Sequence, residues 1–181
     1  FPIEEENPFL GWRGIRISLD HPEIFLVQIR AMLRASENNG NLKIMLPMIS
    51  SIGELDGALQ LVNRAYEELI NEEDLCIKKP PIGAMIEVPA AVYQVDQLAK
   101  RVDFLSVGTN DLTQYLLAVD RNNPRVASMY NSFHPSVLSA LHLISKQANN
   151  ASCEVSICGE LAGDPLGAVL LVGLGYRHLS M

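Results

Sequence analysis

Short apolar runs alternate with stretches of helical periodicity along the whole chain, and this alternation constrains the fold most strongly. Five mostly apolar runs are typical of short strands: 42–48, 82–88, 103–110, 153–160 and 177–181. Six stretches carry apolar residues at helical spacing: 22–38, 53–71, 89–100, 112–119, 136–149 and 165–173. Because the strands are apolar along their length, we expect parallel strands buried on both faces, with helices packed outside.

Two architectures fit this alternation, a doubly wound sheet and a (β/α)₈ barrel. No GxGxxG or GxxxxGK[ST] motif follows any strand, so the usual mononucleotide site of a doubly wound sheet is missing. Polar residues instead follow successive strands, and in barrels that end carries the chemistry. We therefore predict an α/β fold, a partial (β/α)₈ TIM barrel. A full barrel needs roughly 250 residues, so we expect residues 1–181 to be a single domain, the central part of a barrel truncated at both ends.

Composition narrows the class of protein. The chain is 48% hydrophobic and 19% charged, which is typical of a globular domain rather than a disordered one. A formal net charge of −7 argues against nonspecific nucleic-acid binding. No apolar stretch reaches the roughly 18 to 20 residues needed to span a bilayer, and the N-terminal segment lacks the features of a signal peptide. We expect a cytoplasmic protein that binds neither nucleic acid nor membrane.

Carboxylates at two strand ends suggest a metal site. Glu87 directly follows "IGAMI" in the run 82–88, and Asn110 ends the run 103–110, with Asp111 next to it. Taken singly, each is as well explained by a helix N-terminus: Glu87 precedes Pro89, and Asn110 or Asp111 fits an N-cap. Taken together, two carboxylates on neighbouring strand ends suit Mg²⁺ or Mn²⁺, which keep waters and accept substrate oxygens.

Arginines and one cysteine extend this candidate site. Arg13 and Arg16 lie in the loop "GWRGIR", and Arg121 follows the helix after Asp111. Single arginines are usually solvated surface residues, but arginines near a divalent metal suggest a small oxyanion. Cys158 lies at a strand tip beside a glycine. Such a cysteine is more often an unreactive core residue, and the alternative is that it donates a proton. A metal, arginines and a proton donor would suit enolate chemistry.

Six motifs occur in order along the chain: "NPFLGWRGIR", "IMLPMI", "MIEVPAA", "VDFLSVGTNDLTQYLLAVDRNN", "HPSVL" and "CGELAGDP". Together they resemble the phosphoenolpyruvate-binding barrel of Enzyme I, the phosphoenolpyruvate-protein phosphotransferase of bacterial phosphotransferase systems. The resemblance covers essentially the whole chain. "LVGLGYRHLSM" and the "EVP" after "MI" look more like the nitrogen-regulatory form than the sugar form.

The resemblance implies a role for each candidate residue. Glu87 and Asp111 would hold Mg²⁺, and Arg13 and Arg121 would bind the phosphate of phosphoenolpyruvate with help from Asn110. Cys158 would protonate the pyruvate enolate at carbon 3.

The family's phosphate acceptor is a histidine in a Gly-Gly-x-Thr-Ser-His type motif of a separate N-terminal domain. None of the four histidines here, at positions 21, 134, 142 and 178, lies in such a context. The sequence around His134 favours a helix-entry residue followed by proline. We expect this fragment alone to be inactive and the whole protein to pass phosphate, through the missing N-terminal domain, to a histidine phosphocarrier protein.

Other functions share these motifs. The chain could be the barrel of a pyruvate phosphate dikinase or phosphoenolpyruvate synthase relative, a Mg²⁺-dependent lyase acting on pyruvate enolates, or a non-catalytic regulatory or dimerisation module. The resemblance also implies that the barrel forms a homodimer.

Overall fold

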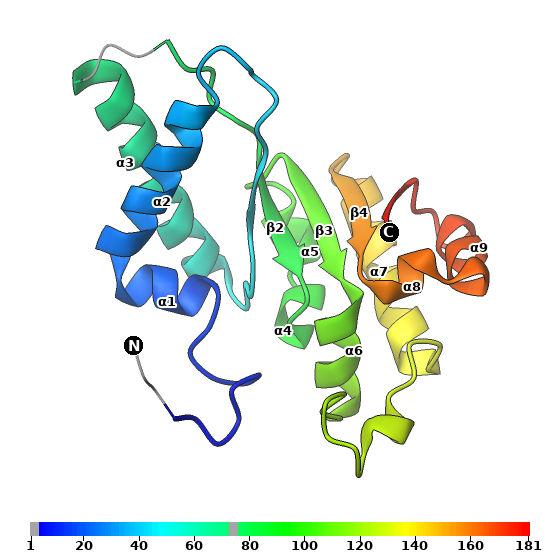
Figure 1. Ribbon diagram of the computed structural model, residues 1–181. Helices are drawn as coiled ribbons and strands as arrows, with labels where there is room; N and C mark the ends of the chain where they lie inside the picture. The colour runs from blue at the N-terminus through cyan, green and yellow to red at the C-terminus, as the bar shows by residue number, and fades with distance from the viewer. Residues whose placement is uncertain (1–3, 73–75) are drawn as a thin grey trace.

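Five parallel strands form one sheet in the computed structural model, which describes residues 4–72 and 76–181 (Figure 1). The strands follow one another across the sheet in chain order. They are β1 (Ile44–Leu46), β2 (Ile82–Ile86), β3 (Phe104–Gly108), β4 (Glu154–Cys158) and β5 (His178–Ser180). A strand order that never reverses is typical of a barrel segment, because a doubly wound sheet reverses direction at its switch point. The predicted barrel-type α/β fold is confirmed.

Helices connect the strands, and Figure 1 shows α4, α5 and α7 behind the sheet. The helices are α1 (Ile15–Asp20), α2 (Pro22–Ala35), α3 (Ile52–Glu72), α4 (Pro89–Val92), α5 (Val95–Leu98), α6 (Thr109–Leu117), α7 (Pro135–Asn150), α8 (Glu160–Gly163) and α9 (Pro165–Gly173), with a 3₁₀ turn η1 (Ala127–Met129). Among the described residues, none of these helices has the length and apolar character required to cross a membrane.

The sheet has a buried outer face and a more polar inner face. On β3 and β4 the outward side chains Leu105, Val107 and Ile157 are fully buried in the core formed with the helices. The alternate positions carry Ser106, Ser156 and Cys158 instead. The parallel register places Ser106 beside Ser156 and Gly108 beside Cys158. Side chains at the same height therefore share one face of the sheet.

The C-terminal ends of β2, β3 and β4 lie at one edge of the sheet, because all three strands are parallel. Glu87 directly follows β2, and α6 begins at Thr109, immediately after β3. The N-terminal segment reaches the same end, where the Tyr115 hydroxyl on α6 donates to the carbonyl oxygen of Phe9. The fold therefore assembles loops that are far apart in sequence around the tips of these strands.

Candidate active site

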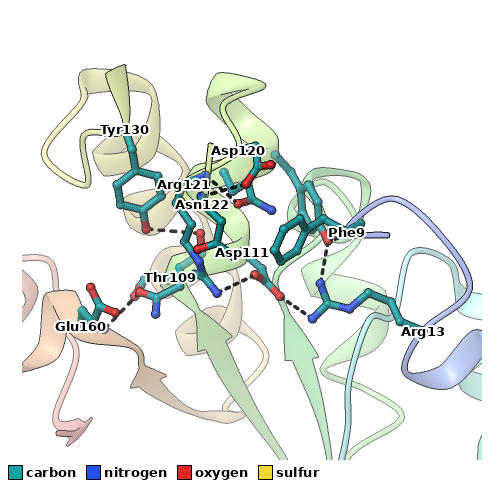
Figure 2. A network of polar contacts seen from close by, with 12 residues as sticks. Phe9, Arg13, Thr109, Asp111, Asp120, Arg121, Asn122, Tyr130 and Glu160 are labelled. Carbon is teal, nitrogen blue, oxygen red and sulfur yellow. Dashed lines mark hydrogen bonds and ion pairs between the residues drawn. The ribbon is translucent and has the colours of Figure 1, made fainter. Parts of the chain in front are cut away.

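Asp111 is the centre of the polar cluster at the strand tips, and it lies between two arginines (Figure 2). Arg13 Nη2 lies 3.0 Å from Asp111 Oδ2, and Arg121 Nη2 lies 3.4 Å from Asp111 Oδ1. Asp111 is only 7% exposed, so these contacts are weakly screened by water. The structure thus brings together three residues that the sequence predicted for one site.

Two buried polar atoms of this cluster lack a hydrogen-bond partner. Asp111 Oδ1 contacts Arg121 only as an ion pair, and Arg121 Nη1 has no hydrogen-bond partner. Buried polar atoms are almost always hydrogen-bonded in native proteins, and exceptions often mark a place for an ion, water or ligand. Asp111 and Arg121 therefore each keep unused hydrogen-bonding capacity within one ion pair.

Glu87 faces the same cluster from the end of β2. It is 5% exposed, and its Oε1 accepts a hydrogen bond of 2.7 Å from the backbone N–H of Met48. Burial is the main cause that raises the pKa of Glu87, and the nearby Asp111 carboxylate raises it further, whereas the Met48 hydrogen bond and Arg13 lower it. The pKa of Glu87 therefore responds to the Asp111 carboxylate at the same strand tips.

Gly108 at the tip of β3 makes room for Glu87. A Cβ atom at this position would lie 2.8 Å from Glu87 Oε2 and 3.0 Å from Glu87 Cβ. Any larger residue would push the Glu87 side chain out of the cluster. The glycine in "SVGTND" is therefore explained by the approach of a carboxylate from the neighbouring strand.

The donor set fits a divalent cation that keeps open coordination positions. Two buried carboxylates, those of Glu87 and Asp111, lie at the same strand tips, and Asp111 Oδ1 lacks a hydrogen-bond partner. Across residues 4–72 and 76–181, no group of three or more His, Cys, Asp or Glu side chains converges. A cation bound here would complete its shell with water or substrate oxygens, which is how Mg²⁺ is usually bound.

Asn110 lies at the seam between β3 and β4. Its side-chain oxygen accepts a 3.2 Å hydrogen bond from the backbone N–H of Glu160, and its carbonyl accepts one of 3.3 Å from the Tyr130 hydroxyl. Gly159 lets the two strand ends approach, because its φ is +124° and a Cβ there would lie 2.3 Å from Thr109 Oγ1. These contacts hold Asn110 in place, and within the described residues its amide nitrogen makes no hydrogen bond.

Cys158 ends β4 on the inner face of the sheet. It is a partly buried free thiol that accepts a 3.3 Å hydrogen bond from the Ser106 hydroxyl and lies 3.4 Å from the carbonyl oxygen of Val107. The register pairs it with Gly108, three residues before Asp111. The thiol is therefore on the same rim as the acidic cluster, although no direct contact joins Cys158 to Asp111.

Two further residues hold the cluster and were not predicted from the sequence. Tyr115 accepts a 3.3 Å hydrogen bond from Arg13 Nη1, and Gln114 Oε1 accepts one of 3.1 Å from the backbone N–H of Arg121. A signal for Tyr115 was present, because residues four apart on a helix share a face and Tyr115 follows Asp111 by four. Arg16 turns away from the cluster, and its Nη1 donates to the carbonyls of Leu10 and Gly11.

A cavity of about 570 Å³ lies behind Tyr115, beside the acidic cluster rather than over it. Its lining is mainly apolar and includes Phe9, Leu10, Met48, Val88 and Val119. The carboxylates and the arginine pair do not line this cavity. The charged residues that line it are Glu6, Arg16 and Asp120.

The fold and the cluster define a barrel-type enzyme domain whose carboxylates and arginines meet at the C-terminal ends of the strands. The chain belongs to the family described as "PEP-utilising enzyme, PEP-binding domain", whose model matches residues 2–181. The predicted family is confirmed.

Two curated relatives are much longer than this chain. It is 60% identical over 183 residues to a protein of Escherichia coli named "Phosphoenolpyruvate-dependent phosphotransferase system", matching 99% of this chain and 24% of that protein. It is 43% identical over 178 residues to the "Phosphoenolpyruvate-protein phosphotransferase" of Bacillus subtilis, matching 98% of this chain and 31% of that protein. The chain thus spans about a quarter to a third of their length.

A solved structure supports the fold alone. The citrate lyase of Burkholderia xenovorans superposes with a TM-score of 0.65 at 23% identity, covering 89% of this chain and 50% of that one. At this identity the likeness extends to the arrangement of strands and helices and not to the residues of the site.

Proposed function

We propose that this chain is the phosphoenolpyruvate-binding part of a phosphoenolpyruvate-protein phosphotransferase. The observation that carries the proposal is the buried Asp111 between Arg13 and Arg121, with unpartnered atoms on both Asp111 and Arg121. A compact trianion such as phosphoenolpyruvate needs cationic donors for its phosphate, and the unpartnered Arg121 Nη1 is such a donor. The names of the curated relatives agree with this substrate.

We propose Glu87 and Asp111 as ligands of Mg²⁺. The ion would supply positive charge next to the phosphoryl oxygens when it is bound. Arg13 and Arg121 pair with Asp111 in the structure. With a cation held by the Asp111 carboxylate, Arg13 and Arg121 would be available to bind and orient the phosphate. Asn110 adds a neutral amide donor from the start of α6.

Phosphoryl transfer leaves an enolate that must be protonated at carbon 3, and we assign this step to Cys158. The Cys158 S–H bond breaks and a C–H bond forms, so that pyruvate is released as the keto acid. The acceptor of the phosphoryl group is a histidine outside this chain, on a separate N-terminal domain, which then phosphorylates a phosphocarrier protein.

The remaining predictions concern the whole protein. We propose that residues 1–181 form the central part of a barrel whose other strands belong to a longer protein, because the relatives are three to four times longer than this chain. We also propose a cytoplasmic homodimer of the nitrogen-regulatory branch. The proposal of the nitrogen-regulatory branch rests on "LVGLGYRHLSM" and on the "EVP" that follows "MI".

The test is phosphoryl transfer from labelled phosphoenolpyruvate to the full-length protein in the presence of Mg²⁺. Asp111→Ala should lower the rate by about 10³-fold, because the developing charge loses its electrostatic partner. Asp56→Ala is the matched control, since Asp56 forms a remote surface ion pair with Arg101. A full-length protein that needs ATP for labelling would be a dikinase relative, and one that cannot be labelled would be a regulatory module.

A further inference from the structure

A chain of three hydrogen-bonding side chains runs along the inner face of the sheet and ends at Cys158. The Ser156 hydroxyl lies 3.0 Å from the Ser106 hydroxyl, and the Ser106 hydroxyl lies 3.3 Å from Cys158 Sγ. The parallel register places Ser106 and Ser156 side by side on β3 and β4. Backbone pairing of β3 with β4 therefore positions these hydrogen-bonded side chains, in addition to their own contacts.

Barrel interiors are usually filled by bulky branched residues such as valine, isoleucine and leucine. Here two serines occupy adjacent inward positions, and Ser106 is only 2% exposed. A buried hydroxyl contributes less packing than an aliphatic side chain and must be hydrogen-bonded to avoid a desolvation cost. The two serines therefore supply hydrogen-bonding groups rather than apolar packing at these positions.

A backbone carbonyl oxygen lies within hydrogen-bond distance at each end of the series Ser156–Ser106–Cys158. The Ser156 hydroxyl lies 3.3 Å from the carbonyl of Leu105, and Cys158 Sγ lies 3.4 Å from the carbonyl of Val107. Because hydroxyl and thiol groups both donate and accept, the hydrogens can point along the chain in either direction with every donor satisfied. Because every donor has an acceptor in both directions, a proton can move along this series without leaving a buried donor unpaired.

From this arrangement, we infer that Ser106 and Ser156 are positioning residues that return a proton to Cys158 after it has protonated the enolate. The inference rests on the proposed role of Cys158. Once the thiol has given its proton to carbon, the protons shift along the series in concert. The S–H bond re-forms as the O–H bond of Ser106 breaks, Ser106 takes the proton of Ser156, and the partly exposed Ser156 takes a proton from a hydronium ion of the solvent, so that no serine alkoxide is formed.

The catalytic test compares two rates in the full-length protein: incorporation of solvent deuterium into the methyl group of pyruvate, and phosphoryl transfer from phosphoenolpyruvate. Ser106→Ala should lower the ratio of deuterium incorporation to phosphoryl transfer by about 10²-fold, within the range of general acid–base effects. Ser156→Ala should lower it by a smaller factor. Ser145→Ala is the control, because Ser145 is an equally buried hydroxyl on α7, remote from Cys158.

A double variant of Ser106 and Ser156 distinguishes a serial proton path from two independent structural effects of the serines. In a serial chain, removal of Ser106 already disconnects Ser156, so Ser106→Ala combined with Ser156→Ala should lower the ratio no further than Ser106→Ala alone. Effects that multiply, or a normal ratio in Ser106→Ala, would overturn the inference. A normal ratio in Cys158→Ala would instead overturn the proposed role of the cysteine itself.

A spectroscopic test requires no activity. In full-length protein lacking its other thiols, the infrared S–H stretching band of Cys158 should shift when Ser106→Ala removes its hydrogen-bond partner. The band should stay in place for Ser145→Ala. An unchanged band in Ser106→Ala would show that the hydroxyl does not contact the thiol, whether or not the protein transfers phosphate.

Discussion

Arg121 shows how a single residue can be held ready for a ligand. Gln114 fixes its backbone, Asp111 pairs with Nη2, and Nη1 is buried without a hydrogen-bond partner. Its neighbour Arg125 is exposed in the same loop. The difference between the two arginines is therefore one of contacts rather than of charge, and substitution can test it directly.

Arg121→Ala should reduce phosphoryl transfer from phosphoenolpyruvate by about 10²- to 10³-fold, because an electrostatic donor to the transferred group is lost. Arg121→Lys should recover little of this loss, since an ammonium group cannot reproduce the planar fork of a guanidinium. Arg125→Ala serves as the control. Steady-state kinetics of the full-length protein measure all three, and equal rates for Arg121→Ala and Arg125→Ala would contradict the assignment.

Glu87 should make the stability of the metal-free protein depend on pH. Its pKa is raised in the folded state, mainly by burial, so the folded state holds the proton more tightly than the unfolded state. The stabilising contribution is fully present below the usual glutamate pKa and is lost as pH rises through the raised pKa. Without metal, Glu87→Gln should therefore raise the thermal midpoint at pH 7.5, and the difference should shrink below about pH 4.

Added Mg²⁺ provides the control for this prediction. The cation should stabilise the parent protein at pH 7.5 and have less effect on Glu87→Gln, because the amide is a poorer ligand than the carboxylate. Thermal unfolding followed by circular dichroism measures both effects. A glutamine variant that is less stable than the parent at pH 7.5 without metal would show that the buried carboxylate is better solvated than its raised pKa implies.

Much of the site could be predicted at the residue scale. The rule that parallel strand ends meet at one edge placed Glu87 and Asp111 at the same end of the sheet. The residues alone offered Arg13, Arg16 and Arg121 as cationic partners, and the family resemblance selected Arg13 and Arg121. The rule could not predict that both arginines pair with Asp111, because such contacts depend on side-chain geometry. The serine pair at 106 and 156 was missed because only the register of β3 with β4 places them together.

At the element scale, strand and helix types were predicted well and their limits less well. The predicted helix 89–100 is two short helices, α4 and α5, and the Gln94 side chain between them donates to the carbonyls of Ser50 and Ala90. Tertiary contacts of this kind are invisible to periodicity. The helices α1 and α8 were not predicted, since six and four residues are too few for a periodic signal. The prediction that His134 starts a helix is confirmed, because its side chain caps α7.

Helix α6 also anchors the N-terminal segment through Tyr115, whose hydroxyl joins Phe9 and Arg13. Tyr115→Phe keeps the ring and removes these contacts, so the amides of residues 7–14 should exchange with deuterium faster. The cost in stability should be about 1 kcal/mol, as for a typical hydrogen bond. Hydrogen exchange read by mass spectrometry would test this.

The Tyr115 contact tethers the N-terminal segment to α6, and Tyr66→Phe is the matched control for this tether. The Tyr66 hydroxyl also donates to the carbonyl of a residue distant in sequence, Ile77. Loss of this bond should leave the exchange of residues 7–14 unaltered. If Tyr115→Phe and Tyr66→Phe gave the same exchange pattern in that segment, the tether between α6 and the N-terminal loop would not exist.

At the scale of the whole molecule, the sheet has two unpaired edges within the described residues. β1 pairs only with β2, and β5 pairs only with β4. Unpaired strand edges favour association with another chain. We therefore expect the isolated 181-residue chain to self-associate, and light scattering should report a mass above the 19.9 kDa of one chain. A stable monomer at micromolar concentration would show that these edges are protected.

The isolated chain should also remain unlabelled by phosphoenolpyruvate. Of the histidines, His134 caps α7, His21 lies near Glu23, and His178 lies 3.7 Å from Glu154. None of these three is paired with the arginines of the candidate site. Acid-labile label on the isolated chain would reveal an acceptor among its own four histidines, and the full-length protein provides the positive control.

The direct passage from β3 into α6 has a consequence for how this domain can change during evolution. Gly108 ends the strand and Thr109 begins the helix, with no intervening loop. A single residue inserted at that junction would rotate the whole helix by about 100° and turn Asp111 away from Glu87. Insertions and deletions should therefore be excluded from this junction, while homologous domains should vary in length at the exposed loop residues 122–125.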